Sequence, residues 1–328
     1  MTTFYVRYDM RRPDFSQASH ADMFAAAIEQ CAWAEGVGIG GAHLSEHHGS
    51  EDGYCPSPLV FASAVAARTT TLPIFISALI APLHDPLQLA EDLCVLDHIS
   101  RGRIFPILSG GYREEEFSAV GKSLKDRKQY MDDLVPFLNK AWSGESFEYQ
   151  GRTITVTPTP FSQPRPPILM GGSSRPAARR AAEHADMFIP SGPEIFEYYR
   201  EELAKRGKPD PGPMAAASTS VVFLAEDPDA YWEQIAPHCQ HETNTYRRWA
   251  DKSGTHSPYQ HFDDLDALRA SGSYEVFTPE AFVEEVAGGR EVALFHPMCG
   301  GISPELAWQS LKLFEEQVLP ALKASGQS

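Results

Sequence analysis

The sequence contains few cysteines, and those it has form no pattern. Five cysteines are scattered over 328 residues. There is no CxxC pair and no cluster of several cysteines and histidines, which argues against both a zinc site and a disulfide framework. Isolated cysteines are usually small, buried packing groups. We therefore expect buried thiols at Cys31, Cys55, Cys94, Cys239 and Cys299.

Basic residues are also scarce, and long apolar runs are absent. The chain has 28 Lys and Arg against 44 Asp and Glu, a formal net charge of −16. This deficit argues against a nucleic-acid partner, because phosphate backbones are bound by clustered Lys and Arg. No window reaches the roughly 18 apolar residues that a membrane helix requires. The start, MTTFYVRYDMRRPDF, lacks a secretory signal. We predict no membrane partner and a cytoplasmic location.

What the sequence does contain is a regular alternation of short apolar strands and amphipathic helices. This alternation is typical of βα units and a parallel sheet. We predict strands at 3–8, 39–44, 73–80, 103–108, 167–170, 187–190, 218–224 and 291–296. Such a series predicts an α/β fold, a (β/α)₈ TIM barrel, as a single domain over residues 1–328.

Helices are expected between most of these strands, with two segments outside the repeat. The helices are predicted at 19–35, 58–68, 86–99, 123–142, 176–184 and 304–322. Residues 147–160 alternate β-branched side chains about Gly151, which predicts a small hairpin. Residues 246–278 are polar and contain Gly254, Pro258 and Gly272. We interpret them as an irregular insertion before the last βα unit, long enough to suggest function or mobility.

Polar or small residues follow several predicted strands, where a barrel of this type has its active site. Glu46-His47-His48 follows the second strand and Ser109-Gly110-Gly111 the fourth. Small residues there leave room for a flat ligand to lie against the backbone. His47 is a candidate general acid or base, although a packing role in the core fits the pattern equally well.

The residues after the fourth strand extend this candidate site. We expect Tyr112 and Arg113 to reach the pocket, with Tyr112 facing the substrate. The acidic run 114–116 is more typical of a solvated first helical turn.

The run GGSSRPAARRAA, from Gly171, is the most interpretable segment. Glycines and hydroxyl side chains directly before a helix expose backbone N–H groups at the positive helix end, where phosphate binds. Arg175 adds a positive charge beside it. The alternative is a turn capped by Ser173 or Ser174 that binds no ligand.

Taken in order, these segments resemble the bacterial-luciferase-like, flavin-dependent monooxygenase superfamily. The matching blocks are SEHHGSEDGYCPSPLVFASAVAARTT, ISALIAPLHDPLQLAEDLCVLDHISRGR, SGGYREEEFSAVG, PPILMGGSSRPAARRAAEHADMF and SPELAWQSLKLFEEQVLPAL. The ordered series spans nearly the whole chain and is more specific than any single block. It is weakest across 193–217 and 246–278.

The resemblance implies a (β/α)₈ barrel with FMN, or in sister branches F420, at the strand C-termini. It implies a pocket histidine in flavin–oxygen chemistry at His47, and a third-strand segment whose non-prolyl cis peptide supports the flavin ring at Ser77-Ala78. Further cofactor contacts are implied near the fourth strand, at the phosphate-binding turn and at a second phosphate-contacting arginine. These positions are Ser109, Gly110, Gly111, Gly171, Gly172, Ser173, Ser174, Arg175 and Arg127.

For function, the resemblance implies a monooxygenase that uses reduced FMN and O₂ on a small aldehyde- or ketone-like substrate. A separate flavin reductase is the implied transient partner, and a homodimer the implied assembly. One alternative is an F420-dependent hydride-transfer enzyme on the same fold. A second is a non-catalytic flavin-binding subunit. Light-emitting luciferases carry a cysteine and an arginine where this chain has Ser109 and Gly110, so light emission is not expected.

Overall fold

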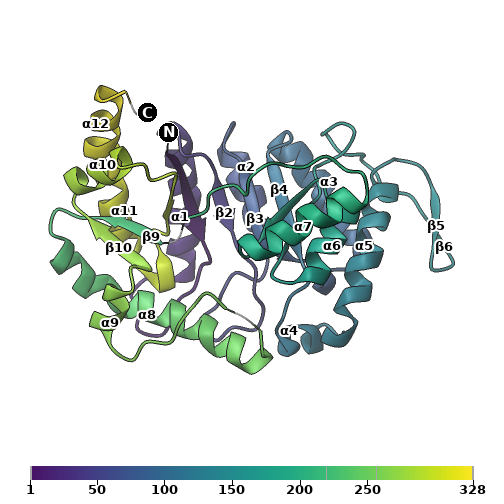
Figure 1. Cartoon of the computed structure of the whole chain (residues 1–328), viewed down its shortest axis with the longest axis horizontal. Coiled ribbons are helices and arrows are strands. Elements are labelled where there is room, and N and C mark those ends of the chain that lie inside the picture. The colour runs from purple at the N-terminus through teal and green to yellow at the C-terminus, as the bar shows by residue number, and fades with distance from the viewer. Residues whose placement is uncertain (1, 219, 256, 327–328) are drawn as a thin grey trace. The chain divides into compact units, whose positions relative to one another are not determined.

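The computed structural model describes residues 2–218, 220–255 and 257–326 (Figure 1). The strands are β1 (Thr3–Tyr8), β2 (Ala42–Leu44), β3 (Ile74–Ile80), β4 (Ile104–Ser109), β5 (Phe147–Tyr149), β6 (Arg152–Ile154), β7 (Leu169–Gly172), β8 (Met187–Pro190), β9 (Val221–Leu224), β10 (Tyr274–Phe277) and β11 (Val292–Phe295). The α-helices are α1 (His20–Gly36), α2 (Pro58–Arg68), α3 (Pro86–Ser100), α4 (Glu114–Ala119), α5 (Arg127–Ala141), α6 (Arg175–His184), α7 (Pro193–Lys205), α8 (Pro228–Ser253), α9 (Leu265–Ala270), α10 (Pro279–Ala287), α11 (Pro304–Leu313) and α12 (Leu319–Ala324). Within the described ranges, no helix is both long and apolar enough to cross a membrane.

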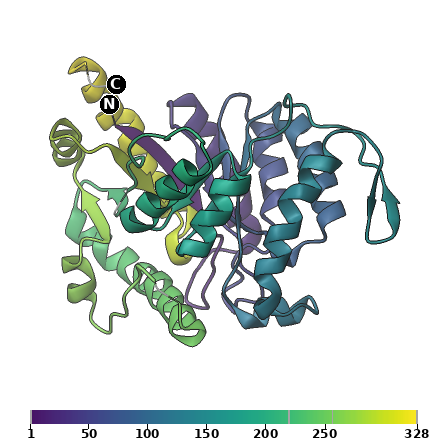
Figure 2. The same cartoon turned by 45° about the vertical axis from the view of Figure 1, so that its right-hand side comes forward.

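The described strands form one large sheet and one small hairpin. The nine-stranded sheet has the order β10-β9-β11-β1-β2-β3-β4-β7-β8. The pairs β1–β11, β9–β10, β9–β11, β3–β4, β4–β7 and β7–β8 are all parallel. The predicted α/β class with a parallel sheet is therefore confirmed. The antiparallel hairpin β5–β6, also predicted, extends away from the nearby helices (Figure 2).

The prediction of eight strands and an irregular segment at 246–278 is wrong in part. Helix α8 continues to Ser253, α9 occupies Leu265–Ala270, and β10 lies within the segment. Tyr274 of β10 pairs with Val221 of β9. The strand is only four residues long and follows a Ser-Gly-Ser turn, so its alternation was too short to detect. The predicted strand at 218–224 includes Thr219, which lies outside the described residues.

The chain divides into two compact units. The terminal unit comprises Met1–His43, His48–Pro56 and Ala216–Ser328, and the central unit comprises Leu44–His47 and Ser57–Ala215. Aromatic rings fill part of the terminal unit: Phe4 lies 4.9 Å from Phe314 and 6.2 Å from Phe295, measured between ring centroids. In the central unit, Phe75 and Phe105 of the paired strands β3 and β4 stack at 5.1 Å. The five cysteines are buried thiols, as predicted.

Charged side chains are buried in the terminal unit at the end of β1. Arg11, which is fully buried, contacts Asp9 at 3.1 Å and Asp52 at 2.7 Å. Paired charges of this kind offset the large cost of removing each group from water. The Arg11 guanidinium also lies 4.5–4.7 Å from the ring centroids of Tyr54, Tyr246 and Trp249.

His296, directly after β11, extends this buried network. Its ring nitrogens lie 3.6 Å from Asp9 Oδ1 and 3.5 Å from Glu242 Oε1. Burial alone would lower the pKa of His296, but Cys299, Asp9 and Glu242 outweigh burial and raise the pKa to about 10.

In the central unit, Arg103 joins the end of α2 to the start of β4. Its guanidinium donates to the carbonyl oxygens of Ala66 and Thr69 at 3.0 Å and of Leu72 at 2.8 Å. It also donates to the Thr69 hydroxyl at 2.9 Å. The last carbonyls of a helix have no partner within the helix. Arg103 supplies partners for them with its planar, five-donor head group.

Replacing Arg103 by Lys is expected to lower the free energy of unfolding by about 2–3 kcal/mol, because an ammonium group cannot reach these separated carbonyls together. Denaturant unfolding followed by circular dichroism measures the change. Arg179→Lys, an exposed site on α6, is the matched control and should change stability by less than about 0.5 kcal/mol. Equal losses in both variants would contradict the role of Arg103.

Candidate functional site

His47, three residues past the end of β2, is held by a carboxylate in the central unit. Its side chain is buried, and Nδ1 lies 2.8 Å from Oε1 of Glu116 on α4. Arg113 donates to the same oxygen at 3.1 Å. A neutral imidazole that donates from Nδ1 to a carboxylate keeps its lone pair at Nε2. In that tautomer Nε2 is the ring atom that can accept a proton.

Tyr112 lies against this nitrogen. Its hydroxyl is 3.4 Å from His47 Nε2, and the two rings meet edge to face with centroids 5.5 Å apart. Tyr112 is partly exposed, whereas His47 and Glu116 are buried. The chain Glu116–His47–Tyr112 thus leads from a buried carboxylate toward a more open side chain.

The neighbouring Glu46 fixes the end of β3. One carboxylate oxygen accepts from the backbone N–H of Ile80, and the other lies 2.8 Å from Nε2 of His84. Lys122 donates to the carbonyl oxygens of Pro82 at 2.7 Å and His84 at 2.8 Å. Burial lowers the pKa of Lys122. These contacts hold the turn after β3 in place without using His47.

The ends of β3 and β4 are shaped by close backbone packing. The Ser77–Ala78 peptide bond is cis, as the resemblance implied. Gly111 has φ +65, and a Cβ there would lie 2.7 Å from Ile80 and 3.0 Å from Phe117. Arg127 donates to the Gly111 carbonyl at 2.8 Å. At Gly110 a Cβ would meet only Met131, at 3.9 Å, so this glycine leaves open space.

The GGSSR run forms the strand-turn-helix that the sequence predicted. Gly171 and Gly172 end β7, and a Cβ at Gly172 would lie 2.4 Å from Ala177 Cβ, so α6 begins very close to the strand. Ser174 is the N-cap of α6 and accepts from the Ala177 N–H. The first N–H groups of such a helix attract anions.

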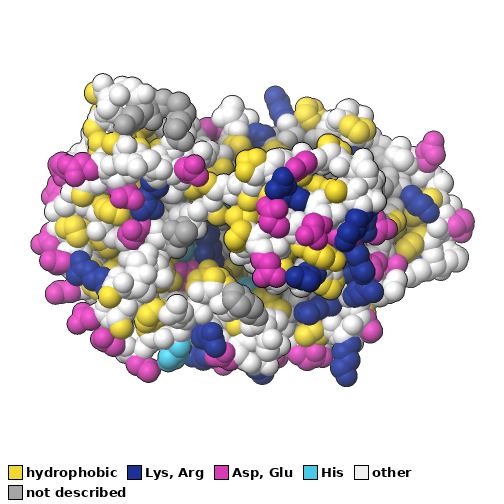
Figure 3. All heavy atoms as spheres, in the orientation of Figure 1, with side chains coloured by type: hydrophobic (Ala, Val, Ile, Leu, Met, Phe, Trp, Pro, Cys, Tyr) yellow, Lys and Arg dark blue, Asp and Glu magenta, His cyan; other side chains and the backbone are white. Residues whose placement is uncertain are grey.

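Arg175 stands exposed at this helix start. Its guanidinium lies 3.4 Å from Glu194 and 5.3 Å from the Tyr198 ring centroid. Figure 3 shows Lys and Arg side chains over the region of α5, α6 and α7, mixed with Asp and Glu. Positive side chains therefore lie on this face although the chain as a whole is acidic.

The contacts collect the predicted site residues into three groups within the central unit. His47 contacts Tyr112, Gly111 is bonded by Arg127, and Gly171–Arg175 form one turn. The prediction that residues 114–116 form a solvated turn is wrong for Glu116, which is 1% exposed and bonded to His47. Three successive glutamates give no sequence signal for which one turns inward; only the tertiary contact separates Glu116 from the others.

A family model described as luciferase-like monooxygenase matches residues 10–293. The chain belongs to the luciferase-like monooxygenase family. Among curated relatives, the oxygenase component of flavin-dependent trigonelline monooxygenase from Acinetobacter baylyi is 27% identical over 46% of this chain and 44% of its own length. An F420-dependent glucose-6-phosphate dehydrogenase from Microbacterium testaceum is 26% identical over 88% of this chain and 91% of its own length. Two further curated relatives, both uncharacterized proteins from Sinorhizobium fredii, match this chain over only about half of their own length, 50% and 56%.

Solved structures of other proteins share the fold of this chain. The oxygenating constituent of 3,6-diketocamphane monooxygenase from Pseudomonas putida, in complex with FMN, has a TM-score of 0.70 and 20% identity, over 98% of each chain. An F420-dependent secondary alcohol dehydrogenase has a TM-score of 0.65 and 14% identity, over 93% of this chain and 98% of its own. With these neighbours, the predicted luciferase-like TIM-barrel class is confirmed.

Gly111→Ala is expected to lower the free energy of unfolding by about 1–3 kcal/mol, because the new methyl group combines a positive φ with two close contacts. Gly110→Ala is the matched control and should leave stability within about 0.5 kcal/mol of wild type. Thermal and denaturant unfolding of both variants measures the difference. A stable Gly111→Ala variant would show that the turn after β4 relaxes.

Proposed function

We propose that the protein is the oxygenase of a two-component flavin system that acts on a small aldehyde- or ketone-like substrate with reduced FMN and O₂. The observation that carries the proposal is the Glu116–His47–Tyr112 chain, which lies in the same unit as the glycine-lined strand ends and the turn at α6. Reduced flavin, when bound, supplies the electrons that activate oxygen. The protein residues then position the reactants and manage protons.

The residues at the strand ends fit a flavin phosphate and ring. The turn before α6 would hold the phosphate through the α6 N–H groups, two hydroxyls and one positive charge. Its residues are Gly171, Gly172, Ser173, Ser174 and Arg175. The flavin ring would be lined by the residues at the ends of β3 and β4, which are Ser77, Ala78, Ser109, Gly110 and Gly111. The open space at Gly110 allows close approach of a flat ligand. Arg127 would act through the Gly111 carbonyl that it bonds, or toward the phosphate as the resemblance implies.

His47 would manage the proton at Nε2. A proton arriving at Nε2 makes the ring an imidazolium, which Glu116 stabilises from the other side through Nδ1. Arg113 keeps the Glu116 carboxylate in place. Tyr112 would orient the substrate or relay its proton through the hydroxyl that faces Nε2. In this scheme His47 is the catalytic residue and Glu116 a positioning residue.

The comparisons support the cofactor and partner in this proposal. One relative is named as an oxygenase component of a flavin-dependent monooxygenase, and one structural neighbour is described in complex with FMN. An oxygenase component receives reduced flavin from elsewhere, which supports a separate flavin reductase as transient partner. A homodimer remains part of the proposal.

An F420-dependent hydride transfer is the second candidate. The F420-dependent glucose-6-phosphate dehydrogenase aligns with this chain over 320 residues, and the trigonelline monooxygenase component over 159 residues. F420 carries the same type of tricyclic ring as a flavin but reacts by hydride transfer. The choice therefore depends on which cofactor the phosphate turn accepts.

Anaerobic fluorescence titration should show tighter binding of reduced FMN than of reduced riboflavin, which lacks the phosphate. Arg175→Gln is expected to weaken FMN binding by about 5–10-fold and leave riboflavin binding unchanged, because only the phosphate contact is lost. Arg179→Gln, on the same helix and also exposed, is the control. Tight F420 binding without reduced-FMN binding would overturn the monooxygenase proposal in favour of the second candidate.

Glu116→Gln is expected to lower kcat by about tenfold and to leave KM nearly unchanged, because a neutral amide no longer holds the His47 imidazole with Nε2 as its acceptor. Product formation from a panel of small aldehydes and ketones gives the rate. The neighbouring exposed Glu114→Gln is the control, and His47→Asn should lose more activity than Glu116→Gln. An unchanged kcat in Glu116→Gln would contradict the positioning role of Glu116.

A further inference from the structure

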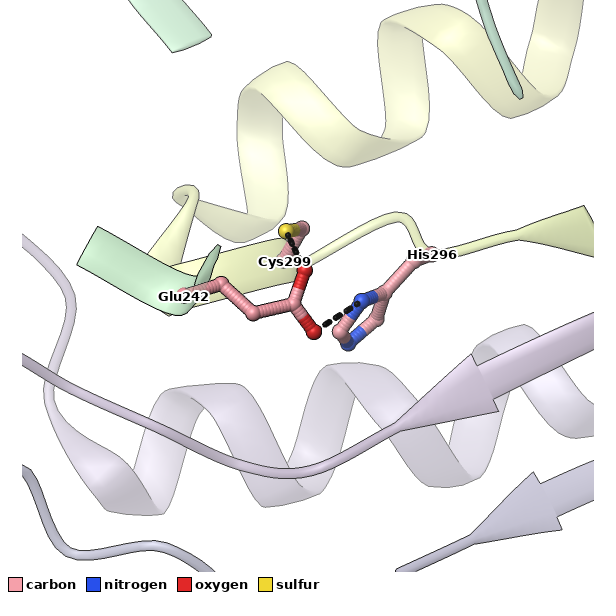
Figure 4. A group of neighbouring side chains, drawn as sticks. All are labelled: Glu242, His296 and Cys299. Carbon is pink, nitrogen blue, oxygen red and sulfur yellow. Dashed lines mark hydrogen bonds and ion pairs between the residues drawn. The ribbon is translucent and has the colours of Figure 1, made fainter. Parts of the chain in front are cut away.

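Three metal-ligating side chains converge inside the terminal unit. Glu242 comes from α8, His296 follows β11, and Cys299 begins the short helix Cys299–Gly301 (Figure 4). Cys299 Sγ lies 3.0 Å from Glu242 Oε2, and His296 Nδ1 lies 3.5 Å from Glu242 Oε1. The three ligand atoms all lie within 4.8 Å of one another. All three residues are buried, with exposed fractions of 1% or less for Glu242, His296 and Cys299.

The hydrogen bonding of this group is incomplete. Within the described part of the chain, neither ring nitrogen of His296 has a hydrogen-bond partner, and Glu242 Oε1 has none either. Their nearest charged neighbours stand at ion-pair distances of 3.3–3.6 Å. More than nine in ten buried polar groups in proteins are hydrogen-bonded. The His296 nitrogens have only these longer ion-pair contacts, so the buried imidazole, next to a carboxylate and a thiol, is available to a ligand.

We propose that Glu242, His296 and Cys299 bind one divalent transition-metal ion of the zinc class. Zinc bonds to thiolate, imidazole and carboxylate are about 2.0–2.3 Å long, which in a tetrahedron places ligand atoms roughly 3.3–3.7 Å apart. Cys299 Sγ lies 3.0 Å from one oxygen of Glu242 and His296 Nδ1 lies 3.5 Å from the other, so the carboxylate faces both of the other ligands. With one atom from each residue, all separations are within 4.8 Å, and the side chains would have to draw together by about 1 Å around an ion. A sulfur ligand disfavours Mg²⁺ and Ca²⁺, which prefer oxygen.

The surrounding residues orient these ligands. The Tyr274 hydroxyl donates to Glu242 Oε2 at 2.9 Å, as outer-sphere partners of metal ligands do. Arg7 lies 3.3 Å from Glu242 Oε1 and would oppose an added positive charge. Glu242 itself and the buried Asp9, whose Oδ1 lies 3.6 Å from His296 Nε2, supply negative charge against it.

Three protein ligands leave the fourth tetrahedral position of a zinc ion to a water molecule. The site has no exposed ligand, and it joins α8, the residue after β11 and the short helix Cys299–Gly301, so a bound ion would hold these segments together. His296 and Cys299 are three residues apart, a common ligand spacing, but the third ligand lies 54 positions earlier, by 296 − 242. Spacing alone therefore does not reveal the site.

Metal content of the full-length protein, expressed in zinc-supplemented medium and purified without chelator, is the first test. Elemental analysis should find about one zinc per chain. Expression with Co²⁺ should give the near-ultraviolet absorption of a thiolate-to-cobalt charge transfer. Cys299→Ser should lose this absorption and weaken metal binding more than about a hundredfold, because losing a ligand costs more than losing an outer-sphere partner. Cys31→Ser, a buried thiol in α1 of the same unit, should keep both.

Wild-type protein that contains no stoichiometric zinc or cobalt would overturn the proposal, whatever the variants do. So would a charge-transfer absorption that survives in Cys299→Ser. His296→Asn serves as a second ligand variant if Cys299→Ser does not fold, and it too should lose the metal. These readouts do not depend on activity, so they are independent of the proposed function.

Discussion

Parallel strand pairing is the constraint on which the rest of the structure depends. Parallel strands need a crossover connection between them, and their carboxyl ends therefore meet at the same edge of the sheet. In the central unit this brings residues after β2, β3, β4 and β7 to one edge, although they are far apart in the sequence. The turns at this edge are free to vary chemically because the strands and helices carry the stability.

Two carboxylates near this edge, Glu46 and Glu116, contact different groups. Glu46 uses its oxygens on the Ile80 N–H and on His84, so it fixes a turn. Glu116 pairs with His47 and Arg113, so it orients an imidazole. Adjacent residues Glu46 and His47 therefore belong to separate networks. Because the networks are separate, the contacts of His47 can change without loosening the backbone after β3.

Much of the fold follows from sequence periodicity, whereas the site follows from it only in part. The bounds of β1 and β8 and of helix α2 agree with the prediction, because apolar residues and prolines mark them clearly. Strand β10 was missed because four residues between turn signals are too few to show a period. Glu116 was missed for a different reason: its environment is created by His47, 69 positions away, and no local pattern encodes that contact.

The close approach of Gly172 to Ala177 limits how the turn at α6 can evolve. The helix start is pressed against the strand end, with no room for a side chain at Gly172. A side chain at Gly172 would displace the backbone, so we expect glycine to be required at this position. Ser173 and Arg175 point outward and carry no such restriction. Relatives that share this turn would differ in ligand preference through its exposed side chains. The backbone N–H groups at the start of α6 would keep the same positions.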